Sequence, residues 1–133
     1  MSARPESPRA AISNQLVRLH SEYYGRGPTK AKTYMIDDLV VVVLEETFTP
    51  VERTLINRGE TAAIMEIRRR FQQAMKEDFT KVIETVTGRR VRAFMSETDL
   101  ESDTSVELFL LDNARPGSAD WTEDGHATVV QAE

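Results

Sequence analysis

The chain contains an internal repeat, and this feature constrains its fold more than any other. Residues 30–35 have the sequence KAKTYM, and residues 90–95 repeat the pattern as RVRAFM. Each copy follows a helix-like segment that ends in a glycine, Gly25 in the first case and Gly88 in the second. Each copy also precedes a second apolar run. The repeat therefore predicts an α+β fold of two helix–strand–strand units, which form an antiparallel sheet of about four strands packed by helices.

The periodicity of apolar residues gives the extent of each element. In the first predicted helix, Ile12, Leu16 and Leu19 recur at spacings of three and four, which is typical of one buried face. The run from Val40 to Leu44 is apolar at every position, which is typical of a strand that is covered on both faces. We expect helices at 10–24 and 60–87, and between them a short helix that begins at Pro50 and is stopped by the run Asn57-Arg58-Gly59. Strands are expected at 29–36, 39–46, 89–95 and 105–111.

Capping residues mark the ends of the predicted helices. Thr49, Pro50 and Glu52 predict a helix start, because a threonine N-cap and a glutamate three positions later form a capping box around a first-turn proline. Gly25 and Gly88 predict helix ends, because glycine readily adopts the left-handed conformation that closes a helix.

Two features predict a homodimer. The apolar strand at 40–44 needs cover on both faces, from helices, a second sheet or another subunit. The long helix at 60–87 would measure roughly 40 Å at about 1.5 Å per residue, which exceeds a compact domain of this size. Part of its apolar stripe is therefore expected to contact a second copy.

Composition excludes several kinds of site. There is no cysteine, so disulfides, thiolate–metal sites and cysteine nucleophiles are excluded, and with two histidines no metal site is expected. The net charge of −5 gives no reason to expect nucleic acid as a partner. No apolar run approaches the roughly 20 residues that span a bilayer, and residues 1–9 do not resemble a signal peptide. We therefore expect a cytoplasmic protein without direct membrane insertion.

The length of 133 residues fits one domain, which we place at residues 10–112. Residues 1–9 contain Pro5 and Pro8 without an apolar stretch, and we expect a disordered N-terminal arm there. Residues 113–133 are rich in small and acidic residues, and we expect a flexible acidic tail with Trp121 as its only large anchor.

The loop at 25–30, Gly-Arg-Gly-Pro-Thr-Lys, is a candidate anion site. Its glycines permit a nest of backbone N–H groups, and its hydroxyl and basic side chains could hold a phosphate. Basic residues of both repeat copies would extend the site if the two hairpins shared one surface. The candidate anion-binding residues are Arg26, Gly27, Thr29, Lys30, Lys32, Arg90 and Arg92. The Walker spacing is absent, however, and a helix cap followed by a turn into a strand is the preferred interpretation of the loop.

Other polar groups receive structural interpretations. The carboxylates between 97 and 103 lack the EF-hand pattern and predict a solvated hairpin loop. Asp37 and Asp38 predict a hairpin turn. We expect His20 on the polar side or edge of the first helix, and the arginines at 68–70 on a solvated helix face. No catalytic residue, metal ligand or cofactor is predicted.

Three stretches carry a resemblance to a known family. They are residues 23–34, which include the run GRGPTKAK, residues 38–45 together with 49–55, and residues 87–96. The chain resembles the MpsC-type family of small bacterial proteins, named for a Na+-translocating, membrane-potential-generating system. The resemblance covers residues 10–112 and leaves out the N-terminal arm and the acidic tail.

The resemblance implies a non-enzymatic, soluble accessory or regulatory protein that is associated with a membrane cation or inorganic-carbon transport system. The expected partners are a second copy and a membrane transporter subunit, which would hold the protein at the inner face of the membrane. The alternative is a cytoplasmic module that binds an anionic small molecule or a nucleotide through the 25–30 loop and the basic strand faces. The family carries no catalytic residues onto this sequence.

Overall fold

Two β-hairpins join into one antiparallel sheet. The computed structural model describes residues 6–112, so the predicted tail and most of the predicted N-terminal arm lie outside the described residues. The strands are β1 (Lys30–Ile36), β2 (Leu39–Glu45), β3 (Val91–Asp99) and β4 (Thr104–Leu111). Their order in the sheet is β1-β2-β4-β3, with every neighbouring pair antiparallel. The second hairpin therefore adds through β4, and β1 and β3 form opposite edges.

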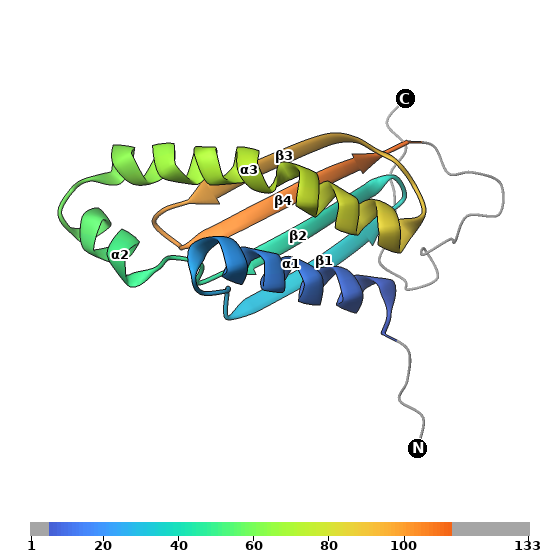
Figure 1. Ribbon diagram of the computed structural model, residues 1–133, viewed down its shortest axis with the longest axis horizontal. Coiled ribbons are helices and arrows are strands. Elements are labelled where there is room, and N and C mark those ends of the chain that lie inside the picture. The colour runs from blue at the N-terminus through green and yellow to red at the C-terminus, as the bar shows by residue number, and fades with distance from the viewer. Residues whose placement is uncertain (1–5, 113–133) are drawn as a thin grey trace, which may run out of the picture.

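The helices lie on one side of this sheet. α1 (Pro8–Tyr24) and α3 (Thr61–Thr87) run side by side across one face, and α2 (Pro50–Asn57) lies beyond one end of the sheet (Figure 1). The arrangement confirms the predicted α+β fold with a long helix. None of the helices between residues 6 and 112 combines the length and the apolar character required to cross a bilayer.

Local capping accounts for the helix ends. The Ser7 hydroxyl accepts a hydrogen bond from the Ala10 N–H at 3.1 Å, so α1 begins two residues earlier than predicted. The capping box of α2 is confirmed: Thr49 N–H donates to Glu52 Oε1 at 2.9 Å, and Glu52 N–H donates to Thr49 Oγ1 at 3.2 Å. Gly25 closes α1 with a φ of 85°, a conformation that glycine adopts without steric cost.

The core lies between the sheet and the two long helices. Alternate residues of the two central strands point to the helices, because successive side chains of a strand lie on opposite faces. Almost fully buried are Ile12 and Leu16 of α1, Met75, Phe79 and Ile83 of α3, Val40, Val42 and Leu44 of β2, and Phe109 and Leu111 of β4. On this face, the apolar side chains of β2 therefore pack against the helices.

Strand β3 is longer than predicted. It begins at Val91, shifts register between Val91 and Ala93, and continues to Asp99. Glu97 and Asp99 thus belong to the strand, and the turn is confined to residues 100–103. The prediction of a solvated acidic loop from 97 onward is wrong in this respect, because pairing with β4 extends the hairpin.

The second face of the sheet has no cover among the described residues. It carries the alternate side chains of all four strands, and the helices lie only on the opposite face (Figure 1). Met95 of β3 is 51% exposed and Tyr34 of β1 is 37% exposed on this uncovered face. The sequence predicts that both faces of β2 are covered. Within residues 6–112, the helices cover one face, and the other face is uncovered.

Candidate functional site

A buried arginine organises the polar interior of the molecule. Arg68 of α3 is almost completely buried and binds Glu52 of α2 through two hydrogen bonds, Nε to Oε2 at 2.7 Å and Nη2 to Oε1 at 2.6 Å. Its Nη2 also donates to the Thr47 carbonyl at 3.0 Å, and its Nη1 donates to Thr47 Oγ1 at 3.2 Å. A guanidinium that is bonded on all sides can remain charged away from water. The arginine therefore ties α2 and the β2–α2 connection to α3.

Aromatic rings enclose the guanidinium of Arg68. Its Cζ lies 4.2 Å from the ring centroid of Tyr24 and 5.0 Å from that of Phe48, distances at which a cation is attracted to a ring face. The His20 ring packs against the Tyr24 ring, and their centroids are 4.4 Å apart. Burial raises the pKa of Tyr24, so its phenol stays protonated.

His20 is buried, and the prediction that it lies on the polar side or edge of the first helix is wrong. Burial lowers the pKa of His20 and the positive charge of Arg68 acts in the same direction, so that the pKa is about 4. A hydrogen bond to the backbone of Arg26 opposes this shift. Its Nδ1 has no hydrogen-bond partner among the described residues. The imidazole is therefore neutral at pH 7 and acts as a packed ring of the interior.

A second buried acid lies on the sheet side of the interior. Glu107 of β4 points to the helices, and the Ser96 hydroxyl lies 2.7 Å and 2.6 Å from its two carboxylate oxygens. Burial raises the pKa of Glu107 to about 8, and the Ser96 hydrogen bond and the charge of Arg68 only partly oppose this. Glu107 is therefore mainly protonated at pH 7, although the positive charge of Arg68 acts on it.

A cleft approaches these groups from the surface. It has a volume of about 300 Å³ and lies between α3 and β3, with Arg69, Gln72 and Lys76 on the helix side and Ser96 and Thr98 on the strand side. Ser96 lines the cleft and also donates to Glu107, so the cleft ends at the buried network. The described residues contain no group of three or more His, Asp or Glu side chains placed to hold a metal ion.

Asp103 fixes the connection from the sheet to α2. Its carboxylate accepts hydrogen bonds from Thr47 N–H at 2.8 Å and from Phe48 N–H at 3.2 Å, and it pairs with Arg53 at 3.0 Å. Asp103 is buried and has a φ of 52°, so its place in a solvated loop is a wrong prediction. Asp103 therefore holds Thr47 in place, and Thr47 accepts hydrogen bonds from Arg68.

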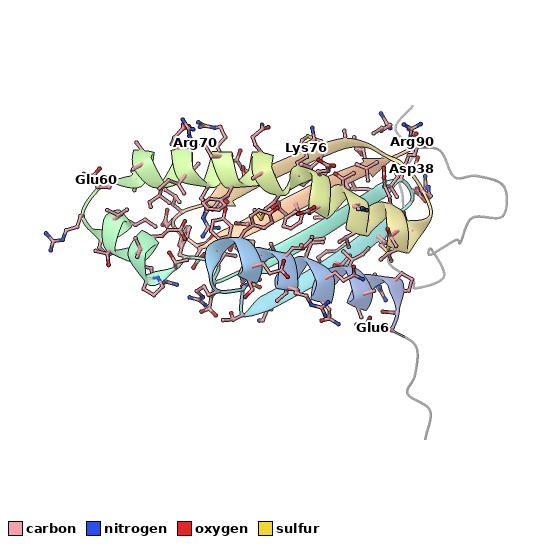
Figure 2. All side chains as sticks on the ribbon, in the orientation of Figure 1. Glu6, Asp38, Glu60, Arg70, Lys76 and Arg90 are labelled. Carbon is pink, nitrogen blue, oxygen red and sulfur yellow. The ribbon has the colours of Figure 1, made fainter. Side chains whose placement is uncertain are left out.

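The three consecutive arginines have different environments. Arg69 and Arg70 are exposed and pair with Glu66, at 2.6 Å and 3.1 Å. Figure 2 shows Arg70 projecting from the outer side of α3. The prediction of a solvated helix face is confirmed for these two residues and wrong for Arg68, which lies on the buried side of the same turn.

The predicted anion loop forms structural contacts in this protein. Arg26 Nη1 donates to the Phe48 carbonyl at 2.9 Å, and the Thr29 hydroxyl donates to Glu46. A side chain at Gly27 would lie 3.3 Å from Val17, so this glycine permits close approach of the loop to α1. These contacts agree with a helix cap followed by a turn. Anion binding at Arg26, Gly27 and Thr29 remains a prediction.

The four basic residues of the two repeat copies lie at opposite edges of the sheet. Lys30 and Lys32 are exposed on the uncovered face of β1, and the Lys32 Nζ lies 5.1 Å from the centroid of the Tyr34 ring. Arg90 precedes β3, and Arg92 occupies its register shift, with Nε 3.4 Å from the Leu111 carbonyl. The sheet order separates the two pairs, so they do not form one basic surface.

Sequence reasoning missed Arg68 and Glu107, although each lies in phase with buried apolar neighbours. Arg68 follows Ile64 by four positions and precedes Met75 by seven, which places it on the buried stripe of α3. Glu107 alternates with Phe109 and Leu111 on the covered face of β4. Testing every charged residue against the phase of its element would have identified both.

Comparisons with known proteins place the chain in a family. Residues 6–113 match the family described as "Na+-translocating membrane potential-generating system (MpsC)", a span that includes every helix and strand described above. The chain is also similar to the uncharacterized protein YbcI of Bacillus subtilis (strain 168), with 30% identity over 105 residues, which are 78% of this chain and 83% of that protein. No solved structure matches it. The chain therefore belongs to the MpsC family.

Proposed function

We propose that this protein is a non-enzymatic accessory or regulatory protein of a membrane cation or inorganic-carbon transport system. The observation that carries the proposal is the family match, which spans the whole described domain and names a membrane-potential-generating system. The protein would act by contact with a membrane subunit, at the cytoplasmic side of the membrane. The proposed working unit is a homodimer, and the apolar half of the uncovered sheet face supports this.

The contact with the transport system is proposed to involve the end of the molecule formed by α2 and the start of α3. Four large apolar side chains are exposed among the described residues, and two of them, Val51 and Ile67, belong to this end, with exposed fractions of 69% and 38%. Contiguous exposed apolar patches that are rimmed by polar residues are typical of protein contact surfaces. The other two, Tyr34 and Met95, lie on the uncovered sheet face.

The proposal is tested by affinity purification from gently solubilised cells that express the protein natively, with the bound proteins identified by mass spectrometry. The parent protein should enrich an integral membrane transport subunit. The double variant Val51→Asp and Ile67→Asp should lose that subunit and keep its circular dichroism spectrum, since both side chains are exposed.

Thr85→Asp is a matched control, because Thr85 is exposed on the same long helix at its other end. This control should recover the subunit as well as the parent does. Recovery of the parent protein without any membrane transport subunit would overturn the proposed function. Equal recovery with the double variant would overturn the proposed contact surface.

A further inference from the structure

The uncovered face of the sheet is divided into an apolar half and a charged half. Register places Tyr34, Val41, Leu108 and Met95 in one row across the four strands. The neighbouring row consists of Ile36, Leu39, Leu110 and Ala93. Both rows are apolar from one edge of the sheet to the other. A surface of this kind is rarely left in contact with water by a folded protein.

The charged half has opposite signs at its two edges. Lys30 and Lys32 lie on β1, and Asp99 and Glu97 lie on β3 in the same two rows. Between them, the row of Lys32 and Glu97 contains Val43 and Val106, and the row of Lys30 and Asp99 contains Glu45 and Thr104. All four edge side chains are exposed. One edge is therefore basic and the other acidic, at the same end of the strands.

We propose that a second copy of this chain covers this face. The two copies are related by a two-fold axis that runs parallel to the strands, above the boundary between β2 and β4 and midway between the two facing sheets. Rotation about this axis exchanges the two edges of the sheet and keeps each row at the same height along the strands. Lys30 and Lys32 then face Asp99 and Glu97 of the partner subunit. The inference rests on the proposed homodimer and adds its surface, its axis and its charge pairing.

The apolar half agrees with the same axis. Each apolar row is placed against its own copy in reverse order, so Val41 meets Leu108 of the partner subunit, and Tyr34 meets Met95 of the partner subunit. Contacts between methionine sulfur and an aromatic ring are favourable. A shallow groove lies where the tyrosine of the second copy would be placed, and its lining consists of Met95, Ser96, Glu97, Val106 and Leu108. Two sheets packed in this way form an aligned sandwich, about 10 Å apart.

The alternative two-fold axis, perpendicular to the strands, is disfavoured by the charges. It would place the charged half of one copy on the apolar half of the other. Lys30 and Lys32 would then be covered by apolar side chains without a carboxylate partner, which costs free energy. The self-complementary pattern of basic and acidic edges therefore selects the axis parallel to the strands.

The size of the face predicts a dimer of modest affinity. Four strands with a spacing of about 4.8 Å and a rise of about 3.3 Å per residue give a face of roughly 20 Å by 25 Å. Stable protein interfaces bury about 800 Å² on each partner, and this face, at roughly 500 Å², is smaller than that. Monomer and dimer should therefore exchange, and the dissociation constant should be measurable by dilution.

Two charge-reversal variants of the full-length chain test the axis. The basic-edge variant carries Lys30→Glu and Lys32→Glu, and the acidic-edge variant carries Glu97→Lys and Asp99→Lys. In the proposed dimer each variant alone brings like charges together at both edges, so its dissociation constant should increase roughly tenfold or more. A mixture of the two variants brings opposite charges together at both edges. The mixture should therefore form a heterodimer more readily than either variant forms a homodimer.

The measurements are sedimentation velocity over a range of concentrations, and native mass spectrometry of the mixture. Met95→Asp should also dissociate the dimer, because it places a charge in the apolar half. Glu101→Lys is the matched control, since this exposed residue lies in the β3–β4 turn, and it should leave the dimer intact. Circular dichroism of each variant checks that the fold is retained.

The measurements test the existence of the dimer separately from its face and axis. A parent chain that stays monomeric at every concentration would overturn the dimer, its geometry and the homodimer of the proposed function. A parent dimer that survives both charge reversals, with no preference for the heterodimer, would overturn this face and axis alone. Preferential heterodimer formation, together with loss of the dimer in Met95→Asp, is the result expected.

Discussion

Arg68 of α3 and Glu52 of α2 form a buried bidentate ion pair, with side-chain exposed fractions of 3% and 7%. Burial by itself would raise the pKa of Glu52, but the hydrogen bonds from Arg68 and from the Thr49 N–H together outweigh it and lower the pKa. Arg68 is thus paired with an ionised partner. Because the two residues lie on different helices, the pair holds α2 in position at the end of the molecule.

Replacing Arg68 with methionine should destabilise the protein strongly. The change leaves the Glu52 carboxylate buried without its cation, which costs about 3–5 kcal/mol in comparable sites. Urea unfolding followed by circular dichroism would measure the loss. Arg70→Met is the matched control on the same helix, because its pair with Glu66 is exposed and such pairs contribute at most about 1 kcal/mol. Equal losses in the two variants would contradict the structural role of Arg68.

A compensating change should recover part of that stability. Glu52→Gln in the Arg68→Met background removes the unpaired charge, and a glutamine oxygen can still accept the Thr49 N–H of the capping box. The double variant should therefore be more stable than Arg68→Met alone in the same unfolding measurement. If the double variant is less stable than Arg68→Met, the capping hydrogen bonds of the Glu52 carboxylate stabilise the protein by more than the burial of its charge destabilises it.

Replacing Asp103 with alanine should loosen the connection between β2 and α2. The substitution leaves the N–H groups of Thr47 and Phe48 without their acceptor in a buried position, and we expect a loss of about 2–3 kcal/mol in urea unfolding. Arg53→Ala is the control, because it removes the half-exposed partner of Asp103 and leaves both backbone hydrogen bonds in place. A loss in Asp103→Ala that does not exceed the loss in the control would refute this role.

Glu107 should make the protein less stable as the pH rises. The pKa of its carboxyl is about 8 in the folded protein, against 4.5 as the ordinary value, so between these limits the folded state retains a proton that the unfolded state releases. Each unit of pH in this window costs up to about 1.4 kcal/mol. Glu107→Gln removes this dependence and can still bond Ser96, so its melting temperature relative to the parent should increase from pH 5 to pH 8.5.

Glu101→Gln controls for the change in net charge, because this exposed residue is remote from the interior. Its melting temperature should follow that of the parent across the same pH range. If Glu107→Gln also follows the parent, the carboxyl of Glu107 has the same affinity for protons in the folded and unfolded states, and the prediction fails.

His20 should make the protein less stable as the pH falls. Its pKa is lowered from 6.5 to about 4 on folding, so between these values the unfolded state binds a proton that the folded state excludes. The loss from pH 6.5 down to pH 4 should approach about 3 kcal/mol. Chemical unfolding at several pH values, compared between the parent and His20→Gln, isolates this contribution. A parallel pH profile in the variant would exclude it.

The elements of this fold could be predicted because their signals are local. The apolar spacing of α1 and α3, the capping box at Thr49 and Glu52, and the closing glycines each depend on residues only a few positions apart. The repeat also indicated two hairpins of one sheet. The extent of β3 was not predictable in this way, because residues 97–99 are strand only where β4 pairs with them.

The candidate site could not be predicted from local signals in the sequence. The helices, most of the strand positions and the α+β class could be predicted, since their signals come from residues a few positions apart. The burial of Arg68 and Glu107 depends on the tertiary fold, because a charged or polar group enters the interior where a distant partner such as Glu52 or Ser96 satisfies it. The positions of the basic residues depend on the strand order, which places β1 and β3 at opposite edges of the sheet. Lys30 therefore lies in the same row as Asp99, and it does not form one basic surface with Arg90.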